Sequence, residues 1–505
     1  MKAIKNIIPV LSICMLYFLN SCDETWLDPA HPNQIVTEDS TFTIPENAEK
    51  FVNACYTNLL QWQESTFSWI GVSSITSDDA DKGSDPGDTG TDKNLLDDLS
   101  YTSEGLSFGE VWAGNYNGVT ACNQAIDQVP QFSIDEALKI RLIGEAKFLR
   151  ALYYFNLVRT FGEVPLVDKV IDANNPSDID KAFTREHVSA IYSFMEQDLN
   201  DAIEALPIVD NYDPKDIGRA TKGAAMGLLA KVSLYDKKWQ QVQDLTDQII
   251  GGSAGNYALV SDYSTIWREI GENGTESLFE IQGRGVSPIA SVQQYSEVQG
   301  ARGTNAIKYQ DGTAAIGGWG FNTPTEDLDN SYEPGDLRKK ATIMHKGDTL
   351  FDGAILLSGA ANDRYNLKAY VSKTMESYSG DPAHTSKNVR ILRMGEIYLL
   401  NAEAANELGN TSKALTSLNA VRHRAGLGDT PASNQADLRN AIWKERRVEL
   451  AMEHDRFFDL VRQGRAGEVM RAHGKNFVDG KNELFPIPQK EIDASLGRYT
   501  QNPGY

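Results

Sequence analysis

Two segments of the chain combine aromatic rings with polar side chains, as a sugar-binding site requires. The first segment, residues 63–108, holds Trp69 followed by Asp78 and Asp79. Sugars have flat C–H faces that stack on aromatic rings, and hydroxyls that bond to carboxylates, amides and guanidinium groups. The second segment, about 251–388, gathers its candidates in one short stretch: Tyr295, Gln299, Arg302, Tyr309, Trp319 and Asn322. The sequence therefore predicts a glycan site built from both segments.

Core packing is the alternative for each tryptophan. Trp319 is the best surface candidate, because the surrounding Gly-Gly-Trp-Gly stretch (317–320) indicates an exposed loop. Trp112 and Trp443 lie in helical segments, so we expect them in the core.

The acidic loop 78–92 raises the question of a calcium site. An EF-hand loop needs acid or amide ligands at positions 1, 3 and 5, followed by glycine at position 6. Counted from Asp79, the fifth position is already Gly83, so the pattern fails. The histidines have no zinc-ligand spacing either. We expect a solvated polar loop, with no metal and no cofactor.

A dense run of charges at 444–456 admits two interpretations. Glu449 and Glu453 could form the carboxylate pair of a glycosidase, which needs a separation of ~5 to 9.5 Å. They could instead pair with neighbouring arginines in an ion network between helices, which we favour. No serine-hydrolase or nucleotide-binding motif is present in the sequence.

The amino terminus has the features of a lipoprotein signal peptide. Two early lysines precede an apolar stretch at 7–19, which is too short to span a bilayer. It ends at Leu19-Asn20-Ser21-Cys22, which is similar to a lipobox with an uncommon Asn20. Ordinary secretory cleavage is the alternative. The sequence thus predicts a signal peptide at 1–21 and lipid attachment at Cys22, and the acidic pair at 23–24 favours display outside the cell.

Helical periodicity accounts for most of the remaining chain. The clearest stripe, Leu142, Ala146, Leu149 and Tyr153, lies within 136–160 and is broad enough to predict burial on most sides. Residues 22–45 read as an extended strap, and 63–108 and 251–388 lack helical period. Further helices are predicted from about 46, at 110–129, 185–205 and 219–236, as a hairpin over 391–425, and at 438–462.

Composition limits the classes of protein further. With 41% hydrophobic residues the chain can bury a large core. Its net charge of −22 argues against nucleic acid as a partner. Cys55 and Cys122 sit among apolar helical neighbours, which predicts buried thiols and no disulfide framework.

Six segments, in order along the chain, resemble the SusD/RagB family of outer-membrane nutrient-uptake lipoproteins. They are GEAKFLRALYYFNLVRTFGEVPLV (144–167), RATKGAAMGLLAKVSLY (219–235), ILRMGEIYLLNAEAANELG (391–409), LNAVRHRAGL (418–427), WKERRVELAMEHDRFFDLVRQG (443–464) and LFPIPQKEID (484–493). The resemblance implies an all-α, mostly helical domain over 46–505. In it, tetratricopeptide-like helix pairs form a scaffold beside a loop-rich, ligand-binding half with minor β-hairpins.

The resemblance also implies a function. Such a protein is lipid-anchored in the outer membrane facing outward, and it passes a glycan or other nutrient to a SusC-like TonB-dependent transporter. Starch-binding relatives use aromatics with an Arg or Asn from the same two segments. Two other classes remain: a glycosidase using acids of the 63–108 loop, such as Asp79, and a ligand-free gating subunit of the transporter. The residues do not identify the nutrient, which could also be a peptide.

Overall fold

The structure is a computed structural model that describes residues 42, 44–61, 66–285, 291–292, 294–303 and 305–505. The predicted signal peptide (1–21), Cys22 and most of the predicted strap (22–45) lie outside these residues, so they stay predictions. Among the described helices, none has both the length and the apolar character needed to cross a bilayer.

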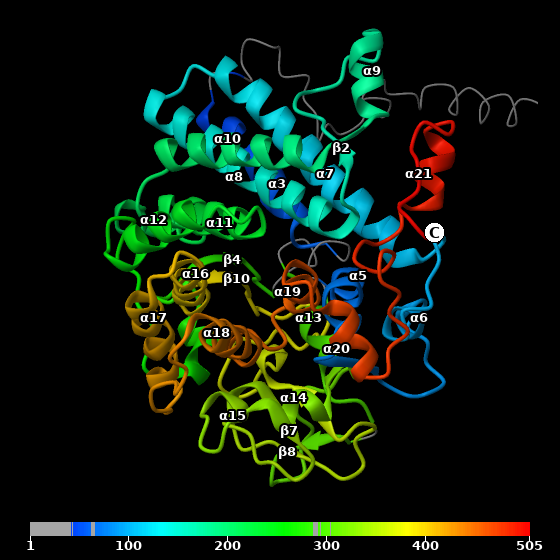
Figure 1. Cartoon of the computed structure of the whole chain (residues 1–505), viewed down its shortest axis with the longest axis vertical. Coiled ribbons are helices and arrows are strands. Elements are labelled where there is room, and N and C mark those ends of the chain that lie inside the picture. The colour runs from blue at the N-terminus through cyan, green and yellow to red at the C-terminus, as the bar shows by residue number, and fades with distance from the viewer. Residues whose placement is uncertain (1–41, 43, 62–65, 286–290, 293, 304) are drawn as a thin grey trace, which may run out of the picture.

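Long helices form one half of the molecule, and successive members pack against each other from α7 to α18 (Figure 1). They are α3 (Pro45–Asn58), α7 (Leu106–Gln128), α8 (Glu136–Phe161), α10 (Val188–Ala205), α11 (Lys222–Tyr235), α12 (Trp239–Ile250), α16 (Met394–Glu407), α17 (Thr411–Arg424) and α18 (Gln435–Glu449). The prediction of a mostly helical scaffold of tetratricopeptide-like pairs is confirmed.

Helix α8 shows why these segments fold as the sequence indicates. The Asp135 side chain caps its first turn by accepting from the amide of Leu138 at 3.0 Å. Gly162 ends it with φ of +74°, a conformation that glycine adopts without strain. The predicted stripe from Leu142 to Tyr153 is buried, as expected for a helix surrounded by others. Cys55 and Cys122 are buried free thiols, as predicted.

Three predicted helix boundaries are wrong. Arg185 and Glu186 form strand β3, so the helix predicted at 185–205 begins at Val188. The segment 438–462 is interrupted after Glu449, and a separate helix α19 (Arg456–Arg462) follows. Met452 and His454 have φ of +65° and +71° in the interruption, which no helix can accommodate. Ile391 belongs to strand β10 (Val389–Arg393), so the predicted hairpin begins three residues later, at Met394.

The strands form two-stranded antiparallel ladders, most of which join distant parts of the chain. The pairs are β1 (Ala80–Gly83) with β6 (Phe321–Pro324), β4 (Ser277–Ile281) with β10, β2 (Val164–Pro165) with β3 (Arg185–Glu186), β5 (Ile307–Lys308) with β8 (Ile355–Leu356), and β7 (Ile343–His345) with β9 (Arg364–Asn366). The β1–β6 ladder joins the two segments that were predicted to hold the site.

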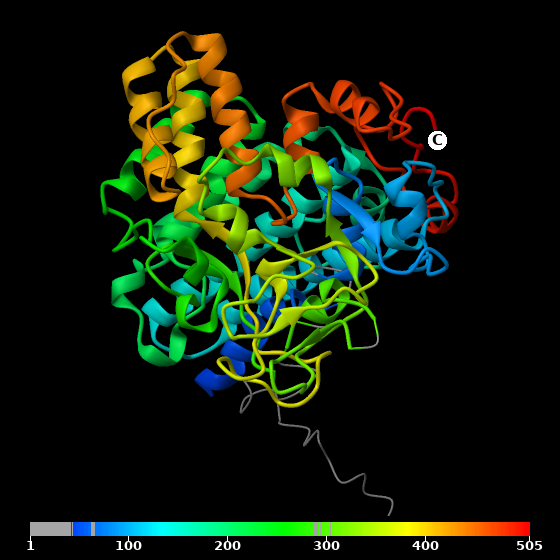
Figure 2. The ribbon, with the colours of Figure 1, turned by 90° about the horizontal axis from the view of Figure 1, so that it is seen from below.

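The segments without helical period contain short helices instead of continuous loop. These are α5 (Phe67–Ile70), a π-helical turn at Gly71–Ile75, α6 (Lys93–Asp97), η7 (Tyr263–Trp267), η8 (Glu269–Gly271), α13 (Tyr295–Gln299), α14 (Glu326–Ser331), α15 (Arg338–Thr342) and η9 (Leu367–Ala369). Figure 2 shows the yellow-green segments of this half gathered beside the yellow and orange helices of residues 394–449. The remaining short helices are α9 (Pro176–Ala182), α20 (Ala466–Ala472), α21 (Gln489–Ala494) and 3-10 turns at Val129–Gln131, Val209–Asn211 and Pro214–Asp216.

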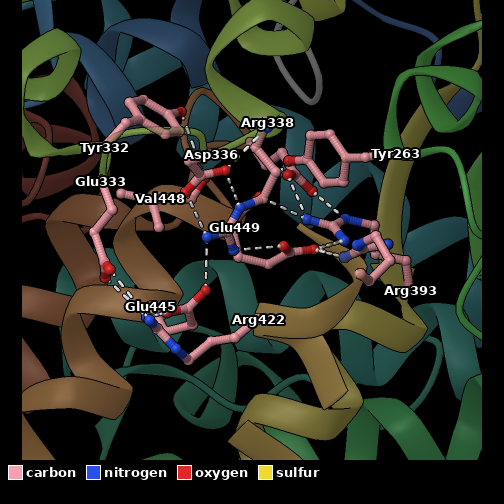
Figure 3. Close-up of polar contacts among 12 residues, drawn as sticks. Tyr263, Tyr332, Glu333, Asp336, Arg338, Arg393, Arg422, Glu445, Val448 and Glu449 are labelled. Carbon is pink, nitrogen blue, oxygen red and sulfur yellow. Dashed lines mark hydrogen bonds and ion pairs between the residues drawn. The ribbon is translucent and has the colours of Figure 1, made fainter. Parts of the chain in front are cut away.

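A buried ion network joins the two halves around Glu449, at the end of α18 (Figure 3). Its carboxylate is fully buried and accepts from Arg393 and Arg424 at 2.5 Å each, and from Arg338 of α15 at 3.0 Å. Burial alone would raise the pKa of Glu449, but the three guanidinium groups hold that pKa well below its usual range. The charged run at 444–456 is therefore a structural network, and its partners come from elsewhere in the chain.

Candidate functional site

Trp319 lies two residues before β6, the strand through which the two irregular segments pair. Its amide donates to the carbonyl of Glu297 at 2.8 Å, and its carbonyl accepts from the Ser84 hydroxyl at 2.8 Å. Its half-buried ring packs edge-on against Phe67, with ring centres 6.0 Å apart. The backbone is thus fixed on both sides, while part of the indole stays at the surface.

Arg302 holds the neighbouring loops together beneath this ring. Its Nη1 donates to Asp88 at 2.5 Å, to the Ser84 hydroxyl at 2.6 Å and to the Trp319 carbonyl at 3.3 Å. Partial burial raises the pKa of Asp88, but the hydrogen bonds from Arg302 and the Gly90 amide and the charges of Arg302 and Lys82 together outweigh it, so that the pKa lies below its ordinary value. A half-buried indole, a charged carboxylate and a guanidinium group therefore share one patch, which we call the Trp319 site.

The glycines around Trp319 have a different role from the one predicted. A Cβ on Gly318 would collide with the carbonyl of Glu297, and one on Gly320 would lie 2.7 Å from the Cβ of Arg302. Gly320 also has φ of +77°. Backbone packs closely here, and so these glycines position the tryptophan instead of loosening its loop.

Five of the predicted site residues are buried, and the structure removes them from the ligand surface. They are Trp69, Asp78, Asp79, Tyr295 and Asn322, each less than a tenth exposed. Trp69 stacks on Phe458 with ring centres 5.7 Å apart, and the Asn322 amide donates to Gln299 at 2.8 Å. The expectation of an outward-facing Trp69 is therefore wrong, and its ring belongs to the core. Trp112 is buried as expected, but Trp443 is only half-buried.

The two buried aspartates serve the fold through arginines of the carboxyl-terminal region. Arg456 binds Asp78 with two hydrogen bonds of 2.8 Å, and Arg447 binds Asp79 at 2.7 Å. Burial raises the pKa of both carboxyls, but the arginines lower that of Asp78 well below its usual range. Acidic side chains that are buried against arginine are not available to a substrate. Asp79 is thus not placed to act as a glycosidase acid.

Tyr309 is half-buried and belongs to a separate small cluster of the loop-rich half. Its hydroxyl donates to Asp352 at 3.1 Å, and Tyr370 donates to the same carboxylate at 2.9 Å. The structure thus joins Trp319 and Arg302 in one patch and ties Tyr309 to a different one.

Asp88, Ser84 and Phe67 belong to the Trp319 site but are not among the predicted residues. Asp88 lies in the acidic loop 78–92, where composition alone does not distinguish it from its neighbours. Among the described residues, no three His, Cys, Asp or Glu side chains are grouped so that they could hold a metal ion.

Comparison with known proteins gives consistent matches over the chain. The family model described as "SusD family" matches residues 276–505, and the one described as "Starch-binding associating with outer membrane" matches residues 25–234. A solved laminarin-binding SusD-like protein is 30% identical, with a TM-score of 0.78, covering 92% of this chain and 100% of that one. The chain belongs to the SusD family.

Further SusD relatives agree with this assignment. SusD-like protein P2 of Formosa agariphila is 27% identical, covering 98% of each chain. The structure of surface glycan-binding protein A from Bacteroides fluxus is 26% identical, with a TM-score of 0.75, covering 92% of this chain and 100% of that one. The predicted membership is therefore confirmed over nearly the whole length.

Proposed function

We propose that this SusD-family protein binds a glycan at the Trp319 site and delivers it to a SusC-like TonB-dependent transporter. The observation that carries the proposal is the half-buried Trp319 ring beside the charged pair Arg302 and Asp88. The ring offers a stacking surface, and the polar pair offers directional hydrogen bonds to sugar hydroxyls. The laminarin-binding relative supports a glycan as the ligand class.

The proposal includes a location. Cys22 would carry the acyl chains that hold the protein on the outer face of the outer membrane, and the family description that mentions association with that membrane supports this. Capture followed by transfer needs modest affinity, because a tightly held ligand would not leave for the transporter. A small, partly exposed patch fits this requirement better than a deep cavity.

Isothermal titration with laminarin and starch oligosaccharides, preceded by a glycan array, tests the proposal. We expect Trp319→Ala to weaken binding by about tenfold or more, since stacking and burial of one aromatic ring contribute roughly 1 to 3 kcal/mol. Trp239→Ala is the matched control, because Trp239 is a half-buried tryptophan of α12 in the helical half.

Other outcomes separate the alternatives. Equal affinity of wild type and Trp319→Ala would refute the site. Cleavage of a glycan by the purified protein would identify an enzyme. A protein that co-purifies with a transporter but binds no glycan or peptide would be a gating subunit. Failure to co-purify with any transporter would refute the delivery role.

A further inference from the structure

A hollow in the loop-rich half shares no lining residue with the Trp319 site. Its volume is about 390 Å³, which falls within the range of small-molecule sites. Its walls come from η7, α15, β7 and the turn at 348–351, and α15 and β7 are adjacent in the lower part of Figure 1. The lining includes Trp267, Arg268, Lys339, Lys340, Leu350 and Phe351.

Arg268 is held in a fixed orientation, and among the described residues four of its five N–H donors have no acceptor. Its Nε donates to Glu376 at 2.8 Å, and its guanidinium carbon lies 3.2 Å from the centre of the Phe351 ring. Glu376 is itself fixed by the amides of Glu269 and Ser372, at 3.0 and 2.7 Å. Within the described part of the chain, the two terminal amino groups of Arg268 make no hydrogen bond. A guanidinium group presented in this way can bind a carboxylate or a sulfate through two parallel hydrogen bonds.

Two further cations, Lys339 and Lys340, line the cavity. Lys340 is exposed and has no ion-pair or hydrogen-bond partner among the residues described. Lys339 pairs with Asp329 at 3.0 Å. The one acid of the lining, Asp348, already accepts from the amide of His345 at 2.8 Å. The unpartnered Lys340 and the unused donors of Arg268 therefore favour an anionic group on the ligand.

Much of the remaining lining is apolar. Leu350, Leu367, Ile343 and Ala341 belong to it, and Phe351 is 40% exposed. An inorganic anion would gain nothing from this part of the lining. A sugar ring that carries an anionic group would place its C–H face on the apolar side and its charge on the arginine.

We propose that this cavity binds an anionic saccharide, meaning a pyranose that carries a carboxylate or a sulfate. Arg268 would bind the anionic group, Lys340 would supplement the charge at the rim, and Phe351 would contact the ring. The inference rests on the proposed glycan-binding function and adds a ligand class for a second site.

Calorimetric titration with three probes tests the inference: a galacturonic-acid tetrasaccharide, a sulfated galactose tetrasaccharide and the neutral laminaritetraose. We expect the full-length protein to bind at least one anionic probe at low salt, and the probe that binds distinguishes carboxylate from sulfate. Lys340→Glu should weaken that binding about tenfold, because an attraction becomes a repulsion. Affinity should also fall as ionic strength rises from about 0.01 M to about 0.15 M, where the Debye length shortens from ~30 to ~8 Å.

Three variants make the result specific. Phe351→Ala should also weaken the anionic probe. Lys237→Glu is the matched control, because Lys237 is an exposed lysine of the helical half with no ion pair among the described residues, and it should change nothing. Trp319→Ala should leave the anionic probe unaffected. An Arg268 variant would be less specific, because loss of the guanidinium group would leave the buried Glu376 carboxylate without this ion-pair partner.

Two results would overturn the inference while leaving the proposed function in place. One is Trp319-dependent binding of neutral glycan with no binding of either anionic probe. The other is anionic binding that Lys340→Glu and Phe351→Ala do not alter. Absence of binding by every glycan would refute both proposals together.

Discussion

Replacing Glu449 by glutamine tests what holds the two halves of the molecule together. The substitution keeps the shape of the side chain and removes its charge. Glu449 is fully buried, and three guanidinium groups bond to it, from α15, β10 and α17 (Figure 3). A neutral amide would leave these buried cations without their shared counter-charge, and it would turn an N–H group toward one of them.

The expected loss of stability depends on the other ion pairs that the three arginines keep in Glu449→Gln. Removing one partner of a buried ion pair destabilises a protein by about 3 to 5 kcal/mol. Here Arg338 keeps Asp336 at 2.7 Å, and Arg393 and Arg424 keep Glu276 at 3.3 and 3.0 Å. We therefore expect the lower end of that range, about 3 kcal/mol. At roughly 2.1 cal/mol/K per residue, a chain of 505 residues would lose about 3 °C in Tm.

Scanning calorimetry and urea titration measure both quantities. Glu196→Gln is the control, because Glu196 pairs with Lys238 at 2.6 Å on the surface and should cost less than about 1 kcal/mol. The pKa of Glu449 is depressed, so its contribution is present above the unfolded value of about 4.5 and is lost as pH falls. The difference in free energy of unfolding between wild type and Glu449→Gln should thus become smaller at acid pH. Equal losses of stability in Glu449→Gln and Glu196→Gln, or a stability difference between wild type and Glu449→Gln that does not change with pH, would refute the reasoning.

Three further perturbations have defined outcomes. Burial lowers the pKa of His454 to about 4, so between pH 6.5 and 4 the unfolded state binds a proton that the folded state does not. Over that interval the free energy of unfolding of wild type, measured by urea titration, should fall by about 3 kcal/mol relative to that of His454→Asn. A constant difference between the two proteins would contradict this. Gly83→Ala would place a Cβ 2.5 Å from the carbonyl oxygen of Gly320 and should lower the free energy of unfolding by about 2 kcal/mol. Gly252→Ala, at a glycine that also has positive φ but has no atom near the added Cβ, should lower it less. Equal losses of stability would exclude the collision as the cause. Cys22→Ala should abolish palmitate labelling and release the protein from the membrane fraction, and retained label would place the acyl chains elsewhere.

The helical half could be predicted because its signal is local. The stripe of α8 repeats within a single segment, and a buried helix needs no knowledge of its neighbours to be recognised. The break after Glu449 could not be predicted, because the segment around it keeps its apolar spacing through Phe457 and Leu460. Buried polar bonds at His454 and Asp455 offset the loss of helical hydrogen bonding there, and such bonds depend on distant residues.

The sequence predicted the residue types of the candidate site, but it did not predict which residues come together there. Trp319 and Arg302 were found because ring and cation are close in sequence. Asp88 joins them through the β1–β6 ladder, which pairs Gly83 with Phe321, and no pattern within either strand specifies that partner. From the sequence alone, Asp78 and Asp79 resemble solvated acids of a loop. In the structure they pair with Arg456 and Arg447, which lie in the carboxyl-terminal region of the chain and which no local pattern connects to them.

The buried network links the scaffold to both proposed sites. Arg338 belongs to the same short helix as Lys339 and Lys340, so its bonds to Asp336 and Glu449 fix the wall of the second cavity against α18. Arg447 of α18 binds Asp79, which directly precedes the β1–β6 ladder, and Trp319 lies two residues before the β6 strand of that ladder. A shallow site has few contacts with which to order a loop, so its residues must be positioned before the ligand arrives. Charged groups buried between the halves provide that order, because they bond only in one arrangement.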